Sequence, residues 1–303
     1  MGEVTQRVLR RLRMRHLELL QLLGELGTVS DAAVRLNLSQ SAVSKMLAEM
    51  ERAFDTPLFT RSKRGVEPTP QGQVVIQGAG VLMNDLLSVE DRLVALAHGA
   101  TDILRIGAFS TVSLMAYGLT EFHRRHPGMT TRVREALPHE LVDALLRAEL
   151  DCIVGALPAD TLSPAQIDAL SFTALAQDHV CVMVVPGHPL RRRKKKLTWA
   201  QLHDQRWVMP AHGTLIRSAL TNVFLGANLR PPQPEIESTS PVTMRWQQAR
   251  EEIREGYLCQ LPLAEYPPLA PISLIARRRD TARRPLLDGL ASALLDEAAR
   301  MGA

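Results

Sequence analysis

The 303-residue sequence has no apolar run that approaches the roughly 18 to 20 residues needed to cross a bilayer. Its arginine-rich start lacks the apolar segment and the cleavage site of an export signal. It has only three cysteines, Cys152, Cys181 and Cys259, and no C-x-x-C pair. We therefore expect a cytoplasmic protein without a membrane span, a disulfide framework or a metal site.

The motifs of the large enzyme classes are also missing. The chain has no G-x-x-x-x-G-K-[ST] phosphate loop, no G-x-S-x-G nucleophile elbow and no H-E-x-x-H metal motif. The segment Gly78-Ala79-Gly80 lacks the third glycine of a dinucleotide fingerprint and follows no predicted strand. Sheets with clefts often host catalysis, but no residue pattern supports an enzyme here, and we expect no cofactor.

What is present is an uneven distribution of charge. Residues 1–65 hold 11 Lys/Arg and 7 Asp/Glu, whereas residues 66–303 hold 25 of each, so the net charge of +4 lies in the N-terminal segment. Neutralised phosphates supply most of the sequence-independent affinity for nucleic acids. A basic module on a neutral chain is therefore typical of a nucleic-acid binder, although surface charge alone also explains such a balance.

Three short helices are predicted near the N-terminus. Leucines recur on one stripe from His16 to Leu26, and Gly27 ends this first helix. Ser30 is expected to cap a second helix that ends at Asn37, and Ser39 to cap a third. Small residues that let the second and third helices approach closely, as a helix-turn-helix requires, are Ala32, Ala33 and Ala42.

A basic hairpin and a long helix follow. Leu58-Phe59 and Val66 to Pro68 are predicted as short strands joined by a basic turn from Arg61 to Gly65. Residues Gln71 to Ala97 carry apolar side chains at helical spacing and no proline, which predicts one long helix. From Thr101 onward strands and helices alternate, and this favours a parallel α/β sheet.

Together these features resemble the N-terminal signature of LysR-type transcriptional regulators. The resemblance rests on Ala32-Ala33, Leu36, Ser39-Gln40-Ser41-Ala42-Val43-Ser44, Leu47, Glu51, Phe54, Pro57-Leu58-Phe59, Arg61, Thr69-Pro70 and Gly72. Departures are Ser41, Met50 and Asp55, where the family usually has Pro, Leu and Gly. Further along, Pro186 to Leu190, Trp207 to Met209 and Gly213 to Arg217 resemble the second half of the family's effector domain.

The resemblance implies an α/β protein with an all-α winged helix-turn-helix, a long linker helix and a two-lobed effector domain like that of periplasmic binding proteins. The expected domains are residues 1–70 for DNA binding, 71–98 for the linker and dimerisation helix and 99–303 for effector binding. Lobe I is expected at about 99–177 and 273–303, and lobe II at about 178–272. A solute-binding protein would share the sensor but not the helix-turn-helix.

The implied function is a sequence-specific transcriptional regulator that senses a small, often anionic, organic effector in the cleft between its lobes. Pairing of the linker helix with its twin would give a homodimer, or a homotetramer built as a dimer of dimers, and a partly palindromic operator. The alternative for this helix is ordinary packing within its own chain. Double-stranded DNA is the expected partner, and RNA polymerase is a further one.

Side chains expected to contact DNA lie on the third helix and in the hairpin. Glutamine pairs with adenine, serine suits bases or phosphates, and lysine reaches guanine or phosphate. The expected contacts are Ser39, Gln40, Ser41, Ser44 and Lys45 on the third helix, with Arg35, Arg61, Lys63 and Arg64 on the phosphate backbone. A solvated polar surface is the alternative for each.

Expected effector contacts are hydroxyl residues at helix starts and near the crossover between lobes, because backbone N–H groups at helix starts attract anions. They are Ser110, Thr111, Ser113, Thr214 and Thr239. The alternative role for each of them is ordinary N-capping.

Three further features bear on function. The six consecutive cations from Arg191 to Lys196 are predicted to form a solvated surface loop rather than a second nucleic-acid patch. Between Val242 and Leu263 a strand usual in the family is expected to be missing, which leaves an effector-insensitive DNA binder as the alternative function. Cys152 and Cys181 lie in apolar strands and are expected to be inert, although the family has an oxidant-sensing branch.

Overall fold

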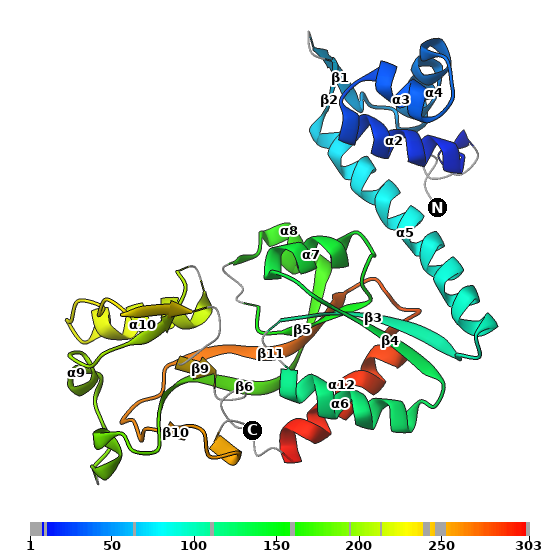
Figure 1. Cartoon of the computed structure of the whole chain (residues 1–303). Helices are drawn as coiled ribbons and strands as arrows, with labels where there is room; N and C mark the ends of the chain where they lie inside the picture. The colour runs from blue at the N-terminus through cyan, green and yellow to red at the C-terminus, as the bar shows by residue number, and fades with distance from the viewer. Residues whose placement is uncertain are drawn as a thin grey trace. The chain divides into compact units, whose positions relative to one another are not determined.

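The computed structural model describes residues 8, 11–62, 65–109, 112–157, 161–193, 195–212, 214–238, 243–245 and 253–300. The chain divides into two compact units: Met1–Ile103 with Leu146–Leu150, and Leu104–Leu145 with Asp151–Ala303 (Figure 1). The first holds the N-terminal helices, the hairpin and the long helix, and the second is a mixed α/β unit. Among the helices in the described ranges, none is long and apolar enough to span a membrane.

The N-terminal unit begins with α2 (Met14–Leu26), α3 (Val29–Arg35) and α4 (Gln40–Phe54). As predicted, Gly27 ends α2 at a φ of 68° and Asn37 follows α3 at a φ of 52°, both in the left-handed region. Ser39 caps α4, as predicted. The predicted cap of α3 is wrong: Thr28, not Ser30, accepts the N–H of Asp31, because the helix already begins at Val29.

One hydrophobic core holds these helices together. Leu19, Leu20 and Leu23 of α2 are fully buried, and they share this core with Ala32 and Ala33 of α3. Full burial of one leucine contributes about 1.5 to 3 kcal/mol relative to exposure. Because α3 has only seven residues, this packing rather than intrinsic helix propensity keeps it folded.

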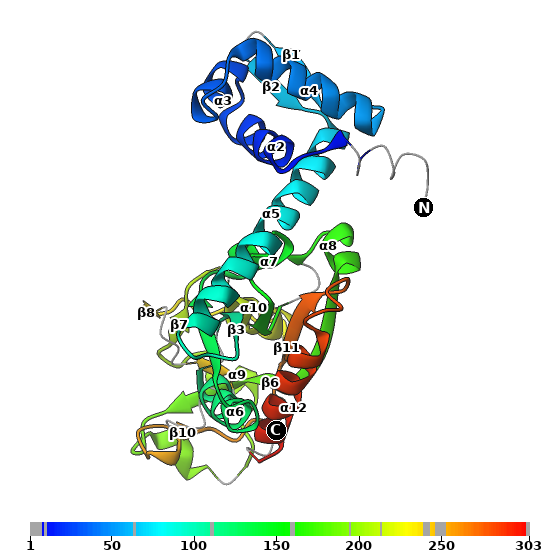
Figure 2. The same cartoon turned by 90° about the vertical axis from the view of Figure 1, so that its right-hand side faces the viewer.

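A hairpin and one long helix complete this unit. Strands β1 (Phe59–Ser62) and β2 (Gly65–Pro68) are antiparallel, and Figure 2 shows them at the N-terminal end of α5 (Pro70–Ala97). Contrary to prediction, Arg61 lies in a strand, paired with Val66, rather than in the turn. At Gly72, α5 passes so close to Leu58, the residue before β1, that any Cβ would overlap the carbonyl oxygen of Leu58.

The second unit is built on a seven-stranded sheet of order β10-β6-β11-β5-β3-β4, with β9 also paired to β6. The strands are β3 (Asp102–Ala108), β4 (Met129–Glu135), β5 (Cys152–Gly155), β6 (Leu170–Val184), β9 (Thr243–Arg245), β10 (Cys259–Gln260) and β11 (Pro268–Arg277). The predicted parallel sheet is only partly correct. Strands β3 and β5 are parallel, but β11 runs antiparallel to β5 and β6.

Helices and a small second sheet cover this framework. Helices α6 (Val112–Arg125) and α12 (Arg284–Arg300) lie side by side (Figures 1 and 2). The remaining elements are α7 (Pro138–Leu146), α8 (Pro164–Ala169), η2 (Pro189–Arg192), α9 (Trp199–Leu202), β7 (Val208–Pro210), α10 (Leu215–Gly226) and β8 (Ile236–Ser238). The larger hydrophobic clusters among the described residues of this unit lie around β3, β5, α6 and α12 and around α9, β7 and α10. The predicted lobe boundaries fall within β6 and β11.

The expectation that a strand is missing between Val242 and Leu263 is wrong. Strand β9 pairs with β6 from Val180 to Val182, and β10 pairs with β6 at Met183 and Val184. These strands have only three and two residues and carry no apolar run, so the sequence pattern could not reveal them. Residues 246–252 of this stretch lie outside the described residues.

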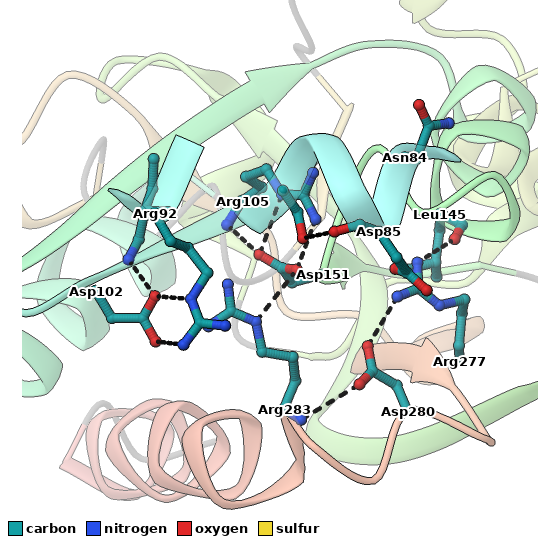
Figure 3. Close-up of polar contacts among 12 residues, drawn as sticks. Asn84, Asp85, Arg92, Asp102, Arg105, Leu145, Asp151, Arg277, Asp280 and Arg283 are labelled. Carbon is teal, nitrogen blue, oxygen red and sulfur yellow. Dashed lines mark hydrogen bonds and ion pairs between the residues drawn. The ribbon is translucent and has the colours of Figure 1, made fainter. Parts of the chain in front are cut away.

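Asp151, only 2% exposed, ties three segments of the second unit together (Figure 3). Its carboxylate accepts the backbone N–H of Arg105 at 2.7 Å and its guanidinium at 3.0 Å, and Arg283 Nε lies 3.6 Å away. Beside it, Arg277 donates to Asp280 at 2.8 Å and to the carbonyl oxygen of Leu145 at 3.0 Å. Each of these guanidinium groups therefore has a carboxylate oxygen close by.

Candidate nucleic-acid interface and effector site

Polar side chains of α3 and α4 meet at the start of α4. Gln40, the first residue of α4, donates from its amide nitrogen to Ser30 Oγ at 3.1 Å. Ser39 Oγ accepts the N–H of Ala42 at 3.2 Å and lies 2.9 Å from Ser41 Oγ. These four side chains are exposed, so the helix start offers hydroxyls and an amide to an approaching ligand.

The predicted reading face of α4 is exposed at three positions and half-buried at a fourth. Gln40, Ser41 and Lys45 are exposed, whereas Ser44 is half-buried. Ser44 shares its side of the helix with Leu47, three residues on, which packs against the core. Sequence periodicity places a residue on a face, but the depth of burial depends on the neighbouring elements.

Glu51 fixes the hairpin to α4. Its Oε1 accepts the backbone N–H of Leu58 at 2.9 Å and that of Phe59 at 3.4 Å. The end of α4 and the first strand of the hairpin therefore share one carboxylate. Glu51 belongs to the family signature, but no role could be assigned to it from the sequence. Its partners are backbone N–H groups, which every residue except proline has, so no residue type identifies them.

Two of the four cations predicted to contact the phosphate backbone of DNA lie within the described residues. Arg61 is exposed on β1, and Arg35 is exposed at the end of α3. Lys63 and Arg64 lie outside the described residues. Arg15 donates to the carbonyl oxygen of Leu36 at 3.0 Å, so this N-terminal arginine helps to hold the turn before α4.

Thr214 is the one predicted effector residue whose side chain the structure describes. It caps α10: its hydroxyl accepts the N–H of Arg217 at 3.3 Å and donates to the carbonyl oxygen of Ala211 at 2.9 Å. Thr214 therefore caps α10, and its side chain is exposed, so the effector contact predicted for it stays a prediction. Ser110, Thr111 and Thr239 lie outside the described residues, as does the side chain of Ser113 in the first turn of α6.

Sequence analysis missed Arg217, which follows Thr214 by three residues. Its side chain is only 7% exposed, and its guanidinium contacts Met209, His212 and Glu237. An arginine in the first turn of a helix that follows a strand can indicate a ligand-binding cation. In the sequence this residue was named only as the end of the family segment Gly213 to Arg217.

The basic run and the cysteines lie where they were predicted. Arg191 to Arg193, Lys195 and Lys196 are exposed, as predicted, although Arg191 and Arg192 belong to the short 3-10 helix η2 rather than to a loop. Lys194 lies outside the described residues. Cys152 and Cys181 are fully buried in β5 and β6. Burial raises the pKa of the Cys152 thiol, and the neighbouring Asp151 raises it further, so the reactive thiolate is disfavoured.

Family models match both parts of the chain. The model described as "Bacterial regulatory helix-turn-helix protein, lysR family" matches residues 14–73, and the model described as "LysR substrate binding domain" matches residues 97–299. The second match alone covers more than half of the chain.

Individual relatives agree with this. The chain is 32% identical over 234 residues to the HTH-type transcriptional regulator GbpR of Azospirillum brasilense, covering 77% of this chain and 67% of that protein. In fold it is similar to a full-length OxyR variant from Pseudomonas aeruginosa, with a TM-score of 0.58, 20% identity and coverage of 93% and 97%. It is also similar to CbnR complexed with its target DNA, with a TM-score of 0.50, 20% identity and coverage of 95% and 100%.

These matches confirm the predicted fold class, an N-terminal helix-turn-helix domain followed by a two-lobed α/β effector domain. They also confirm DNA, further copies of the chain and a small-molecule effector as the partners of this kind of protein. The chain belongs to the LysR family of bacterial transcriptional regulators.

Proposed function

We propose that this regulator reads its operator with the start of α4. The observation that carries the proposal is the exposed cluster of Gln40, Ser41 and Lys45 at the first turns of that helix. In helix-turn-helix proteins the N-terminal residues of the second helix contact base edges in the major groove. Gln40 suits adenine and Lys45 suits guanine or phosphate, while Ser39, Ser41 and Ser44 complete the contact with bases or phosphates.

The phosphate backbone is held by cations beside this helix. We assign this role to Arg35, Arg61, Lys63 and Arg64, because phosphate contacts fix the register of a protein on DNA without reading its sequence. The exposure of Arg35 and Arg61 supports the assignment. Glu51 keeps the hairpin at a fixed position relative to α4, so both contacts form together.

We further propose that an anionic effector contacts Ser110, Thr111, Ser113, Thr214 and Thr239. The exposed hydroxyl of Thr214 at the start of α10, which has 12 residues, supports this, because helix N-termini favour negative charge. Residues 1–70, 71–98 and 99–303 would form the DNA-binding, linker and effector-binding parts. The presence of β9 and β10 gives no support to an effector-insensitive protein.

The family is one of transcriptional regulators, and we infer that this member acts without a catalytic step. Its place of action is the cytoplasm, where its operator lies, and RNA polymerase is the partner that a regulator bound there would address.

Binding to DNA from upstream of its own gene and to scrambled DNA, followed by fluorescence anisotropy at two salt concentrations, tests the reading role of α4. Gln40→Ala with Ser44→Ala should reduce the preference for the upstream DNA by about tenfold or more, since a good base contact contributes about 1 to 3 kcal/mol of discrimination. Binding to scrambled DNA should stay nearly unchanged.

The matched control removes the same two side-chain types from α5, as Gln73→Ala with Ser88→Ala. It should leave the preference intact. Equal loss of binding to both DNAs in the α4 variant would remove these residues from base reading.

A further inference from the structure

Arg217 lies at the place where α/β sheets commonly bind ligands. Strands β7 and β8 are parallel, with Met209 opposite Glu237 near their carboxyl ends, and α10 begins shortly after β7. The guanidinium of Arg217 contacts both of these residues. Ligands of open α/β sheets typically bind just outside the carboxyl ends of the strands, beside the N-termini of the following helices.

This buried cation lacks the partners that a buried cation normally has. Its Nη1 lies 3.0 Å from Met209 Sδ, which is a weak acceptor, and its Nη2 lies 3.5 Å from His212 Nε2. The nearest carboxylate oxygen, Glu237 Oε1, is 3.9 Å from Nη1, which is beyond hydrogen-bond distance. Among the described residues, no oxygen accepts a hydrogen bond from this guanidinium.

Other buried arginines in the same unit are paired. The side chain of Arg105 is 12% exposed and donates to Asp151 at 3.0 Å, and that of Arg277 is 14% exposed and donates to Asp280 at 2.8 Å (Figure 3). Arg217 is more buried than either. A desolvated charge without a hydrogen-bonded counter-ion is costly, so a negative group that supplies the missing acceptors would stabilise this guanidinium.

We propose that Arg217 recognises a carboxylate of the effector. This inference rests on the proposed effector site at Thr214 and deepens it by naming the chemical class of the ligand. The planar guanidinium binds a carboxylate through two parallel hydrogen bonds, a geometry that lysine does not offer. Arg217 lies in the first turn of α10, and the N-terminus of this helix adds a favourable field for the same negative charge.

The surrounding side chains allow this exchange. Glu237 is 45% exposed, and its Oε1 also lies 3.4 Å from Nε2 of His212, whose side chain is 78% exposed. When the carboxylate of the ligand binds the guanidinium of Arg217, the side chain of Glu237 keeps His212 and solvent as its partners. A permanent Arg217–Glu237 ion pair is the competing role, and it predicts no response to added carboxylates.

Thermal unfolding of the full-length protein provides the test. Sodium benzoate and sodium succinate are compared with benzamide and succinamide at equal concentration, with ionic strength held constant by sodium chloride. At least one carboxylate should raise Tm in a concentration-dependent way, because a molecule that binds only the folded state stabilises it. Its uncharged amide should not.

Arg217→Met replaces the guanidinium by an unbranched apolar side chain and should abolish the rise of Tm with added carboxylate. Arg230→Met is the matched control on an exposed arginine and should retain it. If Arg217→Met lowers the Tm of the free protein, Arg217→Lys keeps the charge without the planar fork, and it should weaken the carboxylate response about tenfold. An undiminished response in Arg217→Lys would contradict two-point recognition.

A wild-type protein that responds to neither carboxylate, or a response that survives in Arg217→Met, overturns the inference. Operator preference, measured by anisotropy on the same samples, separates the two proposals. Retained preference without a carboxylate response overturns only the role of Arg217. A wild-type protein that binds the upstream DNA no better than scrambled DNA overturns the proposed DNA-reading function.

Discussion

At the scale of single residues, Glu121 binds the two arginines at the end of its own helix, α6, and one of them, Arg125, connects α6 to α12. Glu121 accepts hydrogen bonds from Arg124 at 2.7 and 2.8 Å and from Arg125 at 2.8 Å. Arg125 also donates to Asp296 of α12 at 2.6 Å. The hydrogen bonds from Arg124 and then Arg125 lower the pKa of Glu121 from its ordinary 4.5 to about 2.

This pKa predicts part of the acid sensitivity of the protein. Between pH 4.5 and about 2 the unfolded chain binds a proton at Glu121 that the folded chain does not, so the contribution of Glu121 to stability is lost as pH falls through this window. Glu121→Gln should flatten the pH dependence of the urea midpoint there. The control Glu135→Gln, on exposed β4, should not, and equal slopes in both variants would contradict the assignment.

Residue roles were predictable from sequence where the partner is close along the chain. Ser39 caps α4 by binding the N–H of Ala42, three residues on, and such short spacings are visible in sequence. The partners of Asp151 could not be predicted from sequence, because Arg105 lies 46 residues away from it. Arg217 was missed for a related reason: its lack of oxygen acceptors is visible only when its burial is known.

At the scale of elements, the hairpin and the basic run are two cation-rich segments with different expected roles. Arg61→Ala with Arg64→Ala should weaken binding to all DNA and reduce the slope of log K against log salt by about 2, one counterion for each lost phosphate contact. Arg192→Ala with Arg193→Ala removes the same charge from the run and should leave the slope unchanged. Anisotropy titrations at several salt concentrations measure both.

An unchanged slope in the hairpin variant would remove the hairpin from the phosphate contacts. A reduced slope in the control would show instead that the basic run touches DNA, against the prediction of a solvated loop.

Elements with a strong periodic pattern were predicted well and short ones were not. The long pattern of α5 gave the helix to within one residue at its start. The hairpin strand β1 extends through Arg61 and Ser62, which have no apolar pattern and are strand residues only because β2 lies opposite. The three residues of β9 likewise depend on pairing with β6, a partner far away in sequence.

At the scale of the whole molecule, α5 carries a long exposed apolar surface. One side of the helix packs against α2 through the buried Ala79. The apolar residues of α5 that are between 46% and 69% exposed are Val74, Leu82, Leu86, Leu87, Val89, Leu93, Val94 and Leu96. Such a surface on a protein that forms oligomers is expected to bind the α5 of a second copy.

Leu86→Glu with Leu93→Glu places two charges on this surface, seven residues apart on one side of the helix. We expect the variant to sediment as a monomer in analytical ultracentrifugation and to lose affinity for a two-half-site operator. Leu137→Glu with Leu295→Glu, on exposed leucines of the second unit, is the control. Dissociation in the control alone would move the subunit contact away from α5.

The two long strands of the second unit, β6 and β11, limit where this chain can be divided into fragments that fold. Strands β6 and β11 pair from Pro268 and His179 at one end to Arg277 and Leu170 at the other, across both predicted lobe boundaries. Any fragment that contains one lobe alone would cut this ladder in the middle and expose its backbone groups. A chimera of two regulators should therefore fold only if it exchanges both strands together, with the two lobes that they connect.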